Sequence, residues 1–407
     1  MPFEVPKGWV WTTLGAINDI ARGGSPRPIK DFLTDDEDGV NWIKISDTTR
    51  DGKYIDSVKE RIRKEGVKKS RMVYKGDFLL TNSMSFGRPY ILNVDGCIHD
   101  GWLVISPIGN AYTADFLYYL LSSSFALDQF TEVASGGVVI NLNSAKVSDT
   151  LFPLPPIGEQ QRIAVEIEHW FTFIDIIEQG KVELQTAIKQ TKSKILDLAI
   201  HGKLVPQDPS DEPASELLKR INPKAQIPCD NEHYPSMWHI AMLGDLFTHN
   251  TGKALNSANK EGKLKDYLTT SNVYWNRFDF SVVKQMPFKE NELDKCTVVK
   301  GDLLVCEGGD VGRSAIWTYD YNICIQNHIH RLRSKEGVYT PFYYYVLKSY
   351  KDHNLIGGKG IGLLGLSSKE LHKILFPVPP LAEQKRIVQK IEELFSLLDG
   401  IEQALQA

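Results

Sequence analysis

One 29-residue segment occurs twice in this chain, at positions that lie 224 residues apart. Residues 151–179 read LFPLPPIGEQQRIAVEIEHWFTFIDIIEQ, residues 375–403 read LFPVPPLAEQKRIVQKIEELFSLLDGIEQ, and 16 of the 29 positions are identical. A long repeat at this spacing indicates that the chain was built by doubling one unit. We therefore expect a pseudo-twofold fold, which suits a ligand with two halves.

Shorter matches extend the repeat through most of the chain. They pair PKGWVWTTLG (6–15) with PSMWHIAMLG (235–244), KGDFLL (75–80) with KGDLLV (300–305), and FGRPYI (86–91) with VGRSAI (311–316). Between these anchors the two halves differ greatly. A constant frame with variable inserts is the arrangement expected if each insert reads a different target.

The variable regions have the pattern of short β-strands bounded by Gly, Asp or Asn. The predicted strands are VNWIKIS (40–46), GDFLLT (76–81), GWLVIS (101–106), DLLVCE (302–307) and NICIQN (322–327). Helical stretches are predicted at 113–130 and 340–351, and their aromatic residues are assigned to the core. Glycine-rich loops at 134–144 and 356–368 complete the two halves.

The repeated segments have the pattern of long helices. Apolar residues follow heptad spacing from Ile163 to Leu198, and the second copy continues in the same phase from Ile387 to Leu405. Residues 157–200 as one helix would reach about 65 Å at roughly 1.5 Å per residue. A seam of this length needs a partner, so we expect an antiparallel pair that joins two β-rich lobes and holds them apart. The second helix is expected to be shorter, and its pairing incomplete.

These patterns predict an α+β fold with five parts. They are a first lobe at 1–156, a central helical spacer at 157–205, a short helix and linker at 206–234, a second lobe at 235–380, and a shortened distal helix at 381–407.

Composition narrows the possible functions. The net charge of −4 counts mildly against indiscriminate binding to polyanions. Residues 59–75 alone carry a balance of +6, which suits either a solvated turn or a phosphate-binding strip.

The five cysteines form no CxxC pair, so buried reduced thiols are expected. No apolar run is long enough to span a membrane, and the N-terminus lacks the profile of a signal peptide, so we expect a cytoplasmic protein.

The pattern P-L/V-P-P-x-x-E-Q-x-R-I followed by a heptad helix, occurring twice, resembles the specificity subunit of type I restriction-modification enzymes. ILDLAIHGKLVPQDPSDEPASELL (195–218) resembles the central region of that family, and WIKISD (42–47) and the Gly-Arg turns at 87 and 312 also fit. The resemblance covers essentially the whole chain, and the doubled element is specific in combination.

The resemblance implies two target recognition domains, each reading one half of a split, asymmetric sequence in double-stranded DNA. The helices would act as a ruler for the unread spacer and dock modification (methyltransferase) subunits, expected to number two, with restriction subunits as further partners. No cofactor would be bound by this chain. S-adenosylmethionine and ATP would be used by the partner subunits.

A DNA reader needs polar side chains on loops that reach base edges, and cations near phosphates. In the first lobe the candidates are Lys44, Ser46, Asp47, Thr48, Thr49, Arg50, Asn82, Ser83, Ser85 and Arg88. In the second lobe they are Thr269, Thr270, Ser271, Asn272, Glu307, Asp310, Arg313 and Lys359. Each has the alternative of a polar turn residue that faces water. The unlike segments 46–50 and 271–275 are better candidates for discrimination than Arg88 and Arg313, which the two halves share.

Two other classes of function remain open at this stage. An enzyme with its own site is disfavoured because no cofactor-binding glycine motif, NPPY-like motif or P-loop occurs. His328 and His330 alternate on a predicted strand, so we expect surface or DNA-facing histidines and no metal site. An adaptor that joins two protein partners without DNA is the second alternative.

The apolar stripe of the helices is interpreted as intramolecular coiled-coil core. Contact with a partner protein is expected on residues that widen the apolar face beyond one seam, namely Trp170, Phe171, Phe173 and Ile176.

Overall fold

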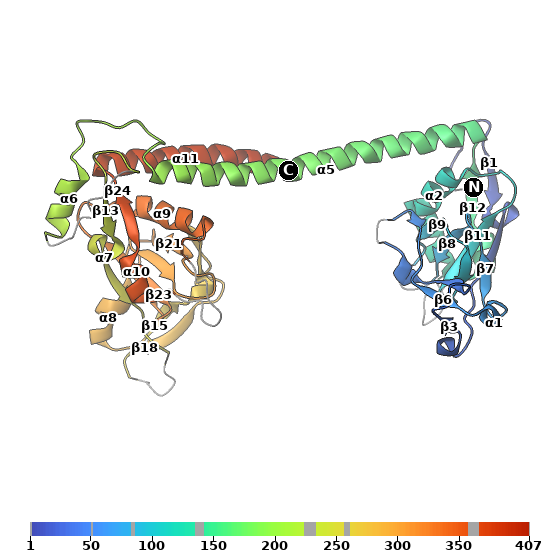
Figure 1. Ribbon diagram of the computed structural model, residues 1–407, viewed down its shortest axis with the longest axis horizontal. Helices are drawn as coiled ribbons and strands as arrows, with labels where there is room; N and C mark the ends of the chain where they lie inside the picture. Colours follow the sequence, from blue (N-terminus) through green and yellow to red (C-terminus); the bar gives the residue numbers. More distant parts are fainter. Residues whose placement is uncertain are drawn as a thin grey trace. The chain divides into compact units, whose positions relative to one another are not determined.

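The computed structural model describes residues 2–49, 52–82, 86–134, 142–223, 233–255, 261–356 and 366–406 (Figure 1). The chain divides into two compact units, Met1–Ile177 and Glu178–Ala407. No helix within these described ranges is both long and apolar enough to cross a membrane.

Unit 1 is built on two five-stranded sheets, with strand orders β3-β6-β4-β10-β7 and β2-β11-β8-β9-β5, and on the two-stranded sheet β1-β12. Its strands are β1 (Val10–Thr13), β2 (Asn18–Arg22), β3 (Leu33–Thr34), β4 (Val40–Ile43), β5 (Tyr54–Ile55), β6 (Glu60–Ile62), β7 (Arg71–Val73), β8 (Phe78–Thr81), β9 (Pro89–Leu92), β10 (Gly96–Ile98), β11 (Trp102–Pro107) and β12 (Leu151–Leu154). Its short helices are α1 (Lys64–Val67), α2 (Ala114–Ser122), α3 (Ser124–Ala134) and α4 (Ser144–Ser148).

Unit 2 contains four-stranded sheets of order β14-β23-β20-β21 and β18-β15-β22-β19, and two-stranded sheets β13-β24 and β16-β17. Its strands are β13 (His239–Met242), β14 (Phe247–Thr251), β15 (Lys263–Leu268), β16 (Val273–Tyr274), β17 (Arg277–Phe278), β18 (Lys284–Phe288), β19 (Thr297–Val298), β20 (Leu303–Cys306), β21 (Ser314–Ile316), β22 (Ile323–Ile325), β23 (Ile329–Ser334) and β24 (Leu375–Val378). Its short helices are α6 (Ala214–Ile221), α7 (Leu243–Leu246), α8 (Glu290–Cys296), α9 (Thr340–Asp352) and α10 (Ser368–Lys373).

The two units share one strand topology. The order β2-β11-β8-β9 of unit 1 corresponds to β14-β23-β20-β21 of unit 2, and β6-β4-β10-β7 corresponds to β18-β15-β22-β19. Even the orientation is repeated, because β4 pairs in parallel with β10 and β15 pairs in parallel with β22. The inserts that differ in sequence are therefore variations on the same fold, and the predicted α+β fold built from a doubled unit is confirmed.

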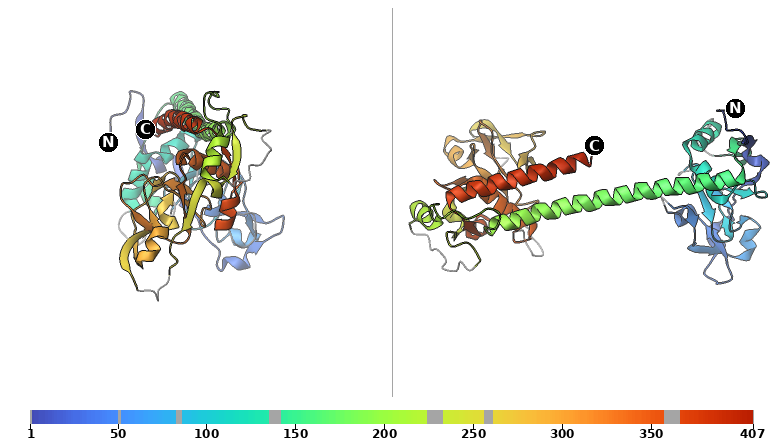
Figure 2. Two further views of the ribbon diagram at one scale, coloured as in Figure 1. Left: turned by 90° about the vertical axis from the view of Figure 1, so that its left-hand side faces the viewer. Right: turned by 90° about the horizontal axis from the view of Figure 1, so that it is seen from above.

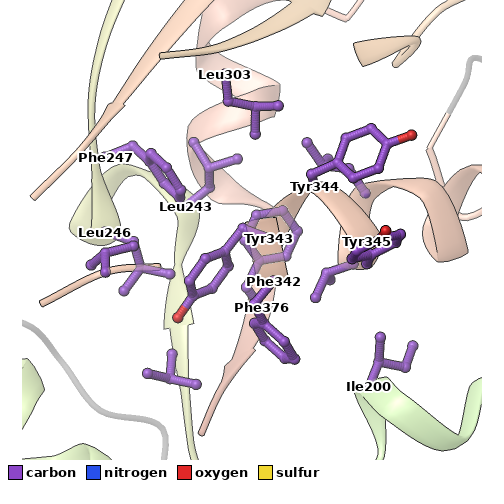
Figure 3. Close-up of a cluster of buried hydrophobic side chains, with 14 of the residues drawn as sticks. Ile200, Leu243, Leu246, Phe247, Leu303, Phe342, Tyr343, Tyr344, Tyr345 and Phe376 are labelled. Atoms are coloured by element: carbon purple, nitrogen blue, oxygen red, sulfur yellow. The ribbon is translucent and has the colours of Figure 1, made fainter. Parts of the chain in front are cut away.

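Apolar residues of the predicted strands and helices form the cores. β8, β11, β20 and β22 form at four of the five predicted strands, and almost all their apolar side chains are buried. The fifth, predicted at 40–46, is shorter, because β4 ends at Ile43 and a 3-10 turn begins at Ile45. The helical stretch predicted at 113–130 is two helices, α2 and α3, which meet at Ser123. In unit 2, Figure 3 shows Phe342 and Tyr343 of α9 packed with Phe376 of β24, which confirms the core assignment of the aromatic residues.

The repeated element is a long helix in each copy. α5 (Ile157–Ile200) has 44 residues and begins in unit 1 and ends in unit 2, whereas α11 (Leu381–Ala404) has 24 residues. Within unit 2 the last part of α5 lies antiparallel beside α11 (Figures 1 and 2), and Lys192 Nζ lies 2.5 Å from an Asp399 carboxylate oxygen. Leu196 and Ile391 are buried in the shared core.

The predicted seam is only partly covered. Ile188 and Ile195 are buried, but Ile174, Ile177 and Leu184 are 46%, 68% and 40% exposed. The interpretation of the whole stripe as intramolecular coiled-coil core is therefore wrong for its middle portion. The reason is geometric: the shorter α11 packs against the final turns of α5 only.

A repeated glutamine ties each helix to its own lobe. Gln160 Oε1 accepts a hydrogen bond from the Thr113 amide at 2.8 Å, and its Nε2 donates to the Pro155 carbonyl at 2.9 Å. Gln384 makes the corresponding bonds with the Tyr339 amide at 3.1 Å and the Pro379 carbonyl at 2.9 Å. Both side chains are fully buried, so this part of the repeat is structural.

Four of the cysteines, Cys97, Cys296, Cys306 and Cys324, are free and buried, as predicted, whereas Cys229 lies outside the described residues. Burial raises the pKa of Cys296 and of Cys306 to about 11. These thiols are therefore protonated and poorly reactive at neutral pH.

Candidate nucleic-acid interface

The main candidate loops of the two lobes have the same backbone geometry. In lobe 1, β4 ends at Ile43, and the Lys44 amide donates to an Asp47 carboxylate oxygen at 2.8 Å across a single 3-10 turn. In lobe 2, β15 ends at Leu268, and the Thr269 amide donates to Asn272 Oδ1 at the same distance. In each lobe a 3-10 turn follows a sheet strand and is closed by the side chain of its last residue, which accepts from the backbone amide that precedes the turn. The side chains between these two residues differ between the lobes.

In the lobe 1 loop, some of the candidate side chains form hydrogen bonds or ion pairs within the lobe, and others do not. Asp47 caps the turn, and Thr48 Oγ1 donates to the Ile45 carbonyl at 2.8 Å. Lys44 Nζ pairs with a Glu60 carboxylate oxygen at 2.5 Å. Ser46 and Thr49 are exposed and have no side-chain partner within the described part of the chain, which makes them the side chains available to a ligand.

The lobe 2 loop divides in the same way. Asn272 is buried, and its amide nitrogen donates to the carbonyls of Asp279 and Val282 at 2.8 and 2.9 Å, so its polar atoms serve the loop. Ser271 is exposed and shares a hydrogen bond of 2.7 Å with Thr269 Oγ1. The Thr270 carbonyl accepts from Arg313 at 2.5 Å, which joins this loop to the Gly-Arg turn.

The Gly-Arg turns of the two lobes have the same backbone conformation. Gly87 and Gly312 have φ angles of 73° and 84°, a left-handed conformation that favours glycine. The arginine that follows lies against an aromatic ring in each lobe, Arg88 over Tyr90 at 5.6 Å and Arg313 over Tyr274 at 4.9 Å. This shared geometry favours a structural contribution from both arginines, in line with their presence in both repeats.

Three other candidates have local partners. Asn82 is buried and donates to the Asp100 carbonyl at 2.8 Å, while its Oδ1 has no partner among the described residues. Glu307 lies 3.1 Å from His328 Nδ1, and Asp310 pairs with Lys351 Nζ at 2.9 Å. The candidates Arg50, Ser83, Ser85 and Lys359 lie outside the described residues, as do most of the two glycine-rich loops.

A basic cluster in lobe 1 was missed by sequence reasoning. Arg22 donates to the Asp100 carbonyl at 3.1 Å, Arg71 donates to the Arg22 carbonyl at 3.0 Å, and Arg27 lies 3.3 Å from the Asp100 carboxylate. A hydrogen bond from Ser25 is the main cause that lowers the pKa of Asp100. The Arg27 side chain is 81% exposed. The RGGSPR sequence at 22–27 carries the only signal, and part of the basic segment 59–75 reaches this cluster through Arg71.

The predicted partner residues are exposed on α5. Trp170, Phe171, Phe173 and Ile176 are 61%, 53%, 45% and 61% exposed. Phe171 lies 6.0 Å from the Tyr119 ring, and His169 lies edge-on to Phe173 at 4.6 Å. Large aromatic side chains that stay in water over consecutive helical turns are typical of a surface covered by another protein.

Lobe 2 contains a chain of three imidazoles. His249 Nδ1 lies 2.7 Å from His372 Nε2, His249 Nε2 lies 2.9 Å from His330 Nδ1, and His330 Nε2 lies 2.7 Å from the Leu366 carbonyl. His330 is fully buried, so the expectation of a surface histidine there is wrong. Because a carbonyl only accepts, His330 Nε2 carries hydrogen, and His249 Nε2 then donates to His330 Nδ1. Within the described residues no group of His, Cys, Asp and Glu side chains could hold a metal ion.

The three hydrogen-bonded imidazoles predict that unit 2 becomes less stable in acid. Burial is the main cause that lowers the pKa of His249 from 6.5 to about 4, with His330 and His372 adding to it. Between these values the unfolded chain binds more protons than the folded one, so the free energy of unfolding falls as pH falls. We expect a loss of about 2 kcal/mol between pH 7 and pH 4, measured by urea unfolding. His249→Gln preserves a donor and an acceptor without titrating, and should flatten the profile; an unchanged profile would contradict the prediction.

Comparison with known proteins places these features in a family. The sequence model described as "Type I restriction modification DNA specificity domain" matches residues 6–186 and 235–407. The chain is 26% identical to the type I restriction enzyme EcoAI specificity subunit of Escherichia coli, over 97% of this chain and 78% of that protein. It is 21% identical to the EcoBI specificity subunit of Escherichia coli, over 98% of this chain and 82% of that protein.

A solved structure has the same fold. The crystal structure of the HsdS subunit from Thermoanaerobacter tengcongensis superposes with a TM-score of 0.66 at 20% identity, covering 99% of this chain and 93% of that one. The two matched ranges lie on the two copies of the internal repeat and span most of the chain. The chain therefore belongs to the type I restriction-modification DNA specificity domain family, and it carries two copies of that domain.

Proposed function

We propose that this chain is the non-catalytic DNA-reading subunit of a type I restriction-modification enzyme. Each lobe reads one half of a bipartite, asymmetric site in double-stranded DNA, and the helices set the spacing of the halves. Methyltransferase subunits dock on the helices, one for each half of the repeat, and restriction subunits join the assembly. The partners use S-adenosylmethionine and ATP, and this chain binds neither.

One observation carries the proposal: the two lobes repeat a backbone frame and change the side chains that it displays. The capped turn after β4 exposes Ser46 and Thr49, and the equivalent turn after β15 exposes Ser271. A protein that reads two different half-sites needs this combination, because the frame positions the loop while the side chains select the bases. Hydroxyl groups donate to or accept from base edges.

Phosphate contacts would come from the cationic side chains near these loops. In lobe 1, Arg22, Arg27 and Arg71 form a basic cluster around Asp100. Such contacts position a protein on DNA and make its affinity fall with salt, without adding sequence preference. Salt-sensitive binding to one duplex with correctly spaced half-sites distinguishes this proposal from a protein adaptor that has no DNA ligand.

Docking of methyltransferase subunits is supported by the exposed middle of α5. Trp170 and Phe171 of α5 are 61% and 53% exposed, although Phe171 lies near the Tyr119 ring of its own lobe. Aromatic residues are enriched at the centres of protein interfaces.

The testing experiment maps methylated adenines in host DNA with the methyltransferase subunit expressed alone or together with this chain. A split motif that appears only with this chain is expected, and no chain-dependent motif would contradict the proposal. The doubly substituted S46A/T49A variant should relax one half-site, and Ser271→Ala should relax the other. A good base contact contributes about 1–3 kcal/mol, so discrimination should fall roughly 5- to 150-fold. Thr172→Ala is the control, because within the described part of the chain that hydroxyl bonds only to the Glu168 carbonyl of its own helix.

A further inference from the structure

The segment that follows α5 folds back onto the start of α11 within unit 2. Gln207 Nε2 donates to a Glu383 carboxylate oxygen at 2.6 Å, and Arg386 binds both carboxylate oxygens of Asp211 at 2.6 and 3.2 Å. The other Glu383 oxygen accepts from the indole nitrogen of Trp238 at 2.9 Å. One peptide segment, residues 203–213, therefore binds a glutamate and an arginine of the repeated frame, and the glutamate in turn binds the tryptophan.

The contacts in unit 2 have the properties of a built site. Glu383 is 1% exposed, and burial raises the pKa of its carboxyl group despite the hydrogen bonds from Trp238 and Gln207, which lower it. The Asp211 side chain is only 8% exposed and contacts Arg386. Such groups tolerate burial because each has a charged or polar partner, and the two-pronged arginine–carboxylate pair is among the stronger contacts available.

Unit 1 contains the same three frame residues in the same places. Trp9 precedes β1 as Trp238 precedes β13, and the strand registers Val10↔Leu154 and His239↔Val378 are equivalent. Glu159 and Arg162 lie 224 positions before Glu383 and Arg386, on the first turns of α5. The buried glutamines beside them make matching bonds in both units, so the two helix starts are held alike.

In unit 1 these residues lack the covering segment. Arg162 is exposed, Glu159 is half-buried, and neither side chain has a hydrogen bond or ion pair with any other described residue. Trp9 Nε1 is buried but has no hydrogen-bond partner among the described residues. A buried donor without an acceptor is destabilising, and the equivalent donor in unit 2, the indole nitrogen of Trp238, is satisfied by Glu383.

We propose that Trp9, Glu159 and Arg162 form a docking site for a peptide segment with the chemistry of residues 203–213. The occupant is a segment of a partner protein that carries an amide side chain and, four residues later, a carboxylate. The amide donates to Glu159, and the carboxylate pairs with Arg162. Covering Glu159 in this way holds it against the Trp9 indole, as Glu383 is held against Trp238. The inference goes beyond DNA reading, and its test needs no DNA.

The probe is a synthetic peptide of residues 201–214, HGKLVPQDPSDEPA, titrated against the full chain by calorimetry. We expect one peptide per chain, with affinity lowered about tenfold by Arg162→Ala and by an Asp211→Asn change in the peptide. Arg162 is exposed and has no side-chain partner among the residues that the structure describes, so its removal should leave the fold intact. Arg386→Ala is the matched control, since that site is already filled by the chain's own segment, and it should retain binding.

Two results would overturn the inference. One is the absence of binding at millimolar peptide. The other is binding that Arg162→Ala leaves unchanged, including binding that only Arg386→Ala alters, because the peptide would then be exchanging with the chain's own segment. A Trp9 indole N–H resonance that shifts with wild-type peptide, and not with the Asp211→Asn peptide, would support the site at the level of the predicted hydrogen bond.

Discussion

Inserting four residues after Gln179 is expected to change the spacer between the two half-sites and to leave the half-sites themselves unchanged. The insertion adds about 6 Å and slightly more than one turn to α5, which is a little under the rise of two base pairs of about 3.4 Å each. Methylation at the original spacing should fall by at least about tenfold, since a mismatched site loses the contacts of one lobe. The measurement is the map of methylated adenines.

The position of the insertion separates helix length from damage to the fold. The side chains on either side of Gln179 are exposed, from Phe171 to Leu184, so four extra residues disturb neither core. The control replaces residues 180–183 with the inserted sequence and keeps the length, and should retain the original motif. New half-sites with an unchanged spacer would show that α5 is not the ruler.

Ile391→Ala should strongly destabilise unit 2 and leave unit 1 intact. Ile391 of α11 is fully buried in the core that also contains Ile195 and Leu196 of α5. Truncating a buried isoleucine removes apolar contacts and leaves a cavity, at a cost of about 2–5 kcal/mol. Hydrogen exchange resolves the two units, because protection should fall in β20 and α9 but stay unchanged in β8.

The matched control lies on the same helix. Leu397 is 62% exposed, so Leu397→Ala removes a similar side chain without opening a cavity and should change the free energy of unfolding by less than about 0.5 kcal/mol. Equal effects of the two substitutions would mean that the packing of α11 against α5 does not stabilise unit 2. A loss of protection in β8 would mean that the two units unfold together.

Several features of the protein could be predicted from the sequence because they depend on local pattern. Strand and helix periodicity located β8, β11, β20, β22 and the two long helices. The Gly-Arg sequences at 87 and 312 indicated turns, and both glycines have a left-handed backbone in the structure. The exact repeat of the proline and glutamine element made the doubled architecture evident without any structure.

Strand order and loop chemistry depended on contacts between distant residues. The parallel pairing of β4 with β10, and of β15 with β22, joins segments about 55 residues apart whose sequences differ between lobes. Neighbouring polar side chains also have different environments: Ser271 is exposed, whereas Asn272 is buried and donates hydrogen bonds to the carbonyls of residues 279 and 282. Both residues are candidates for DNA contact because both are polar. Hydrogen-bond partners from elsewhere in the chain determine which of them can contact a ligand.

The apolar stripe of the long helices was also predicted only in part. Heptad spacing predicted that α5 and α11 would pair, and the pairing is present in unit 2. Spacing did not reveal that Ile174 and Ile177 would remain exposed to water, because burial depends on whether another surface reaches them. Folding also brings together the three imidazoles of His249, His330 and His372, and it places residues 203–213 over Glu383. Neither contact could be predicted, because each joins residues that are distant in the sequence. Local sequence sets the conformation of each segment, whereas burial, pKa and hydrogen-bond partners follow from what the fold places beside it.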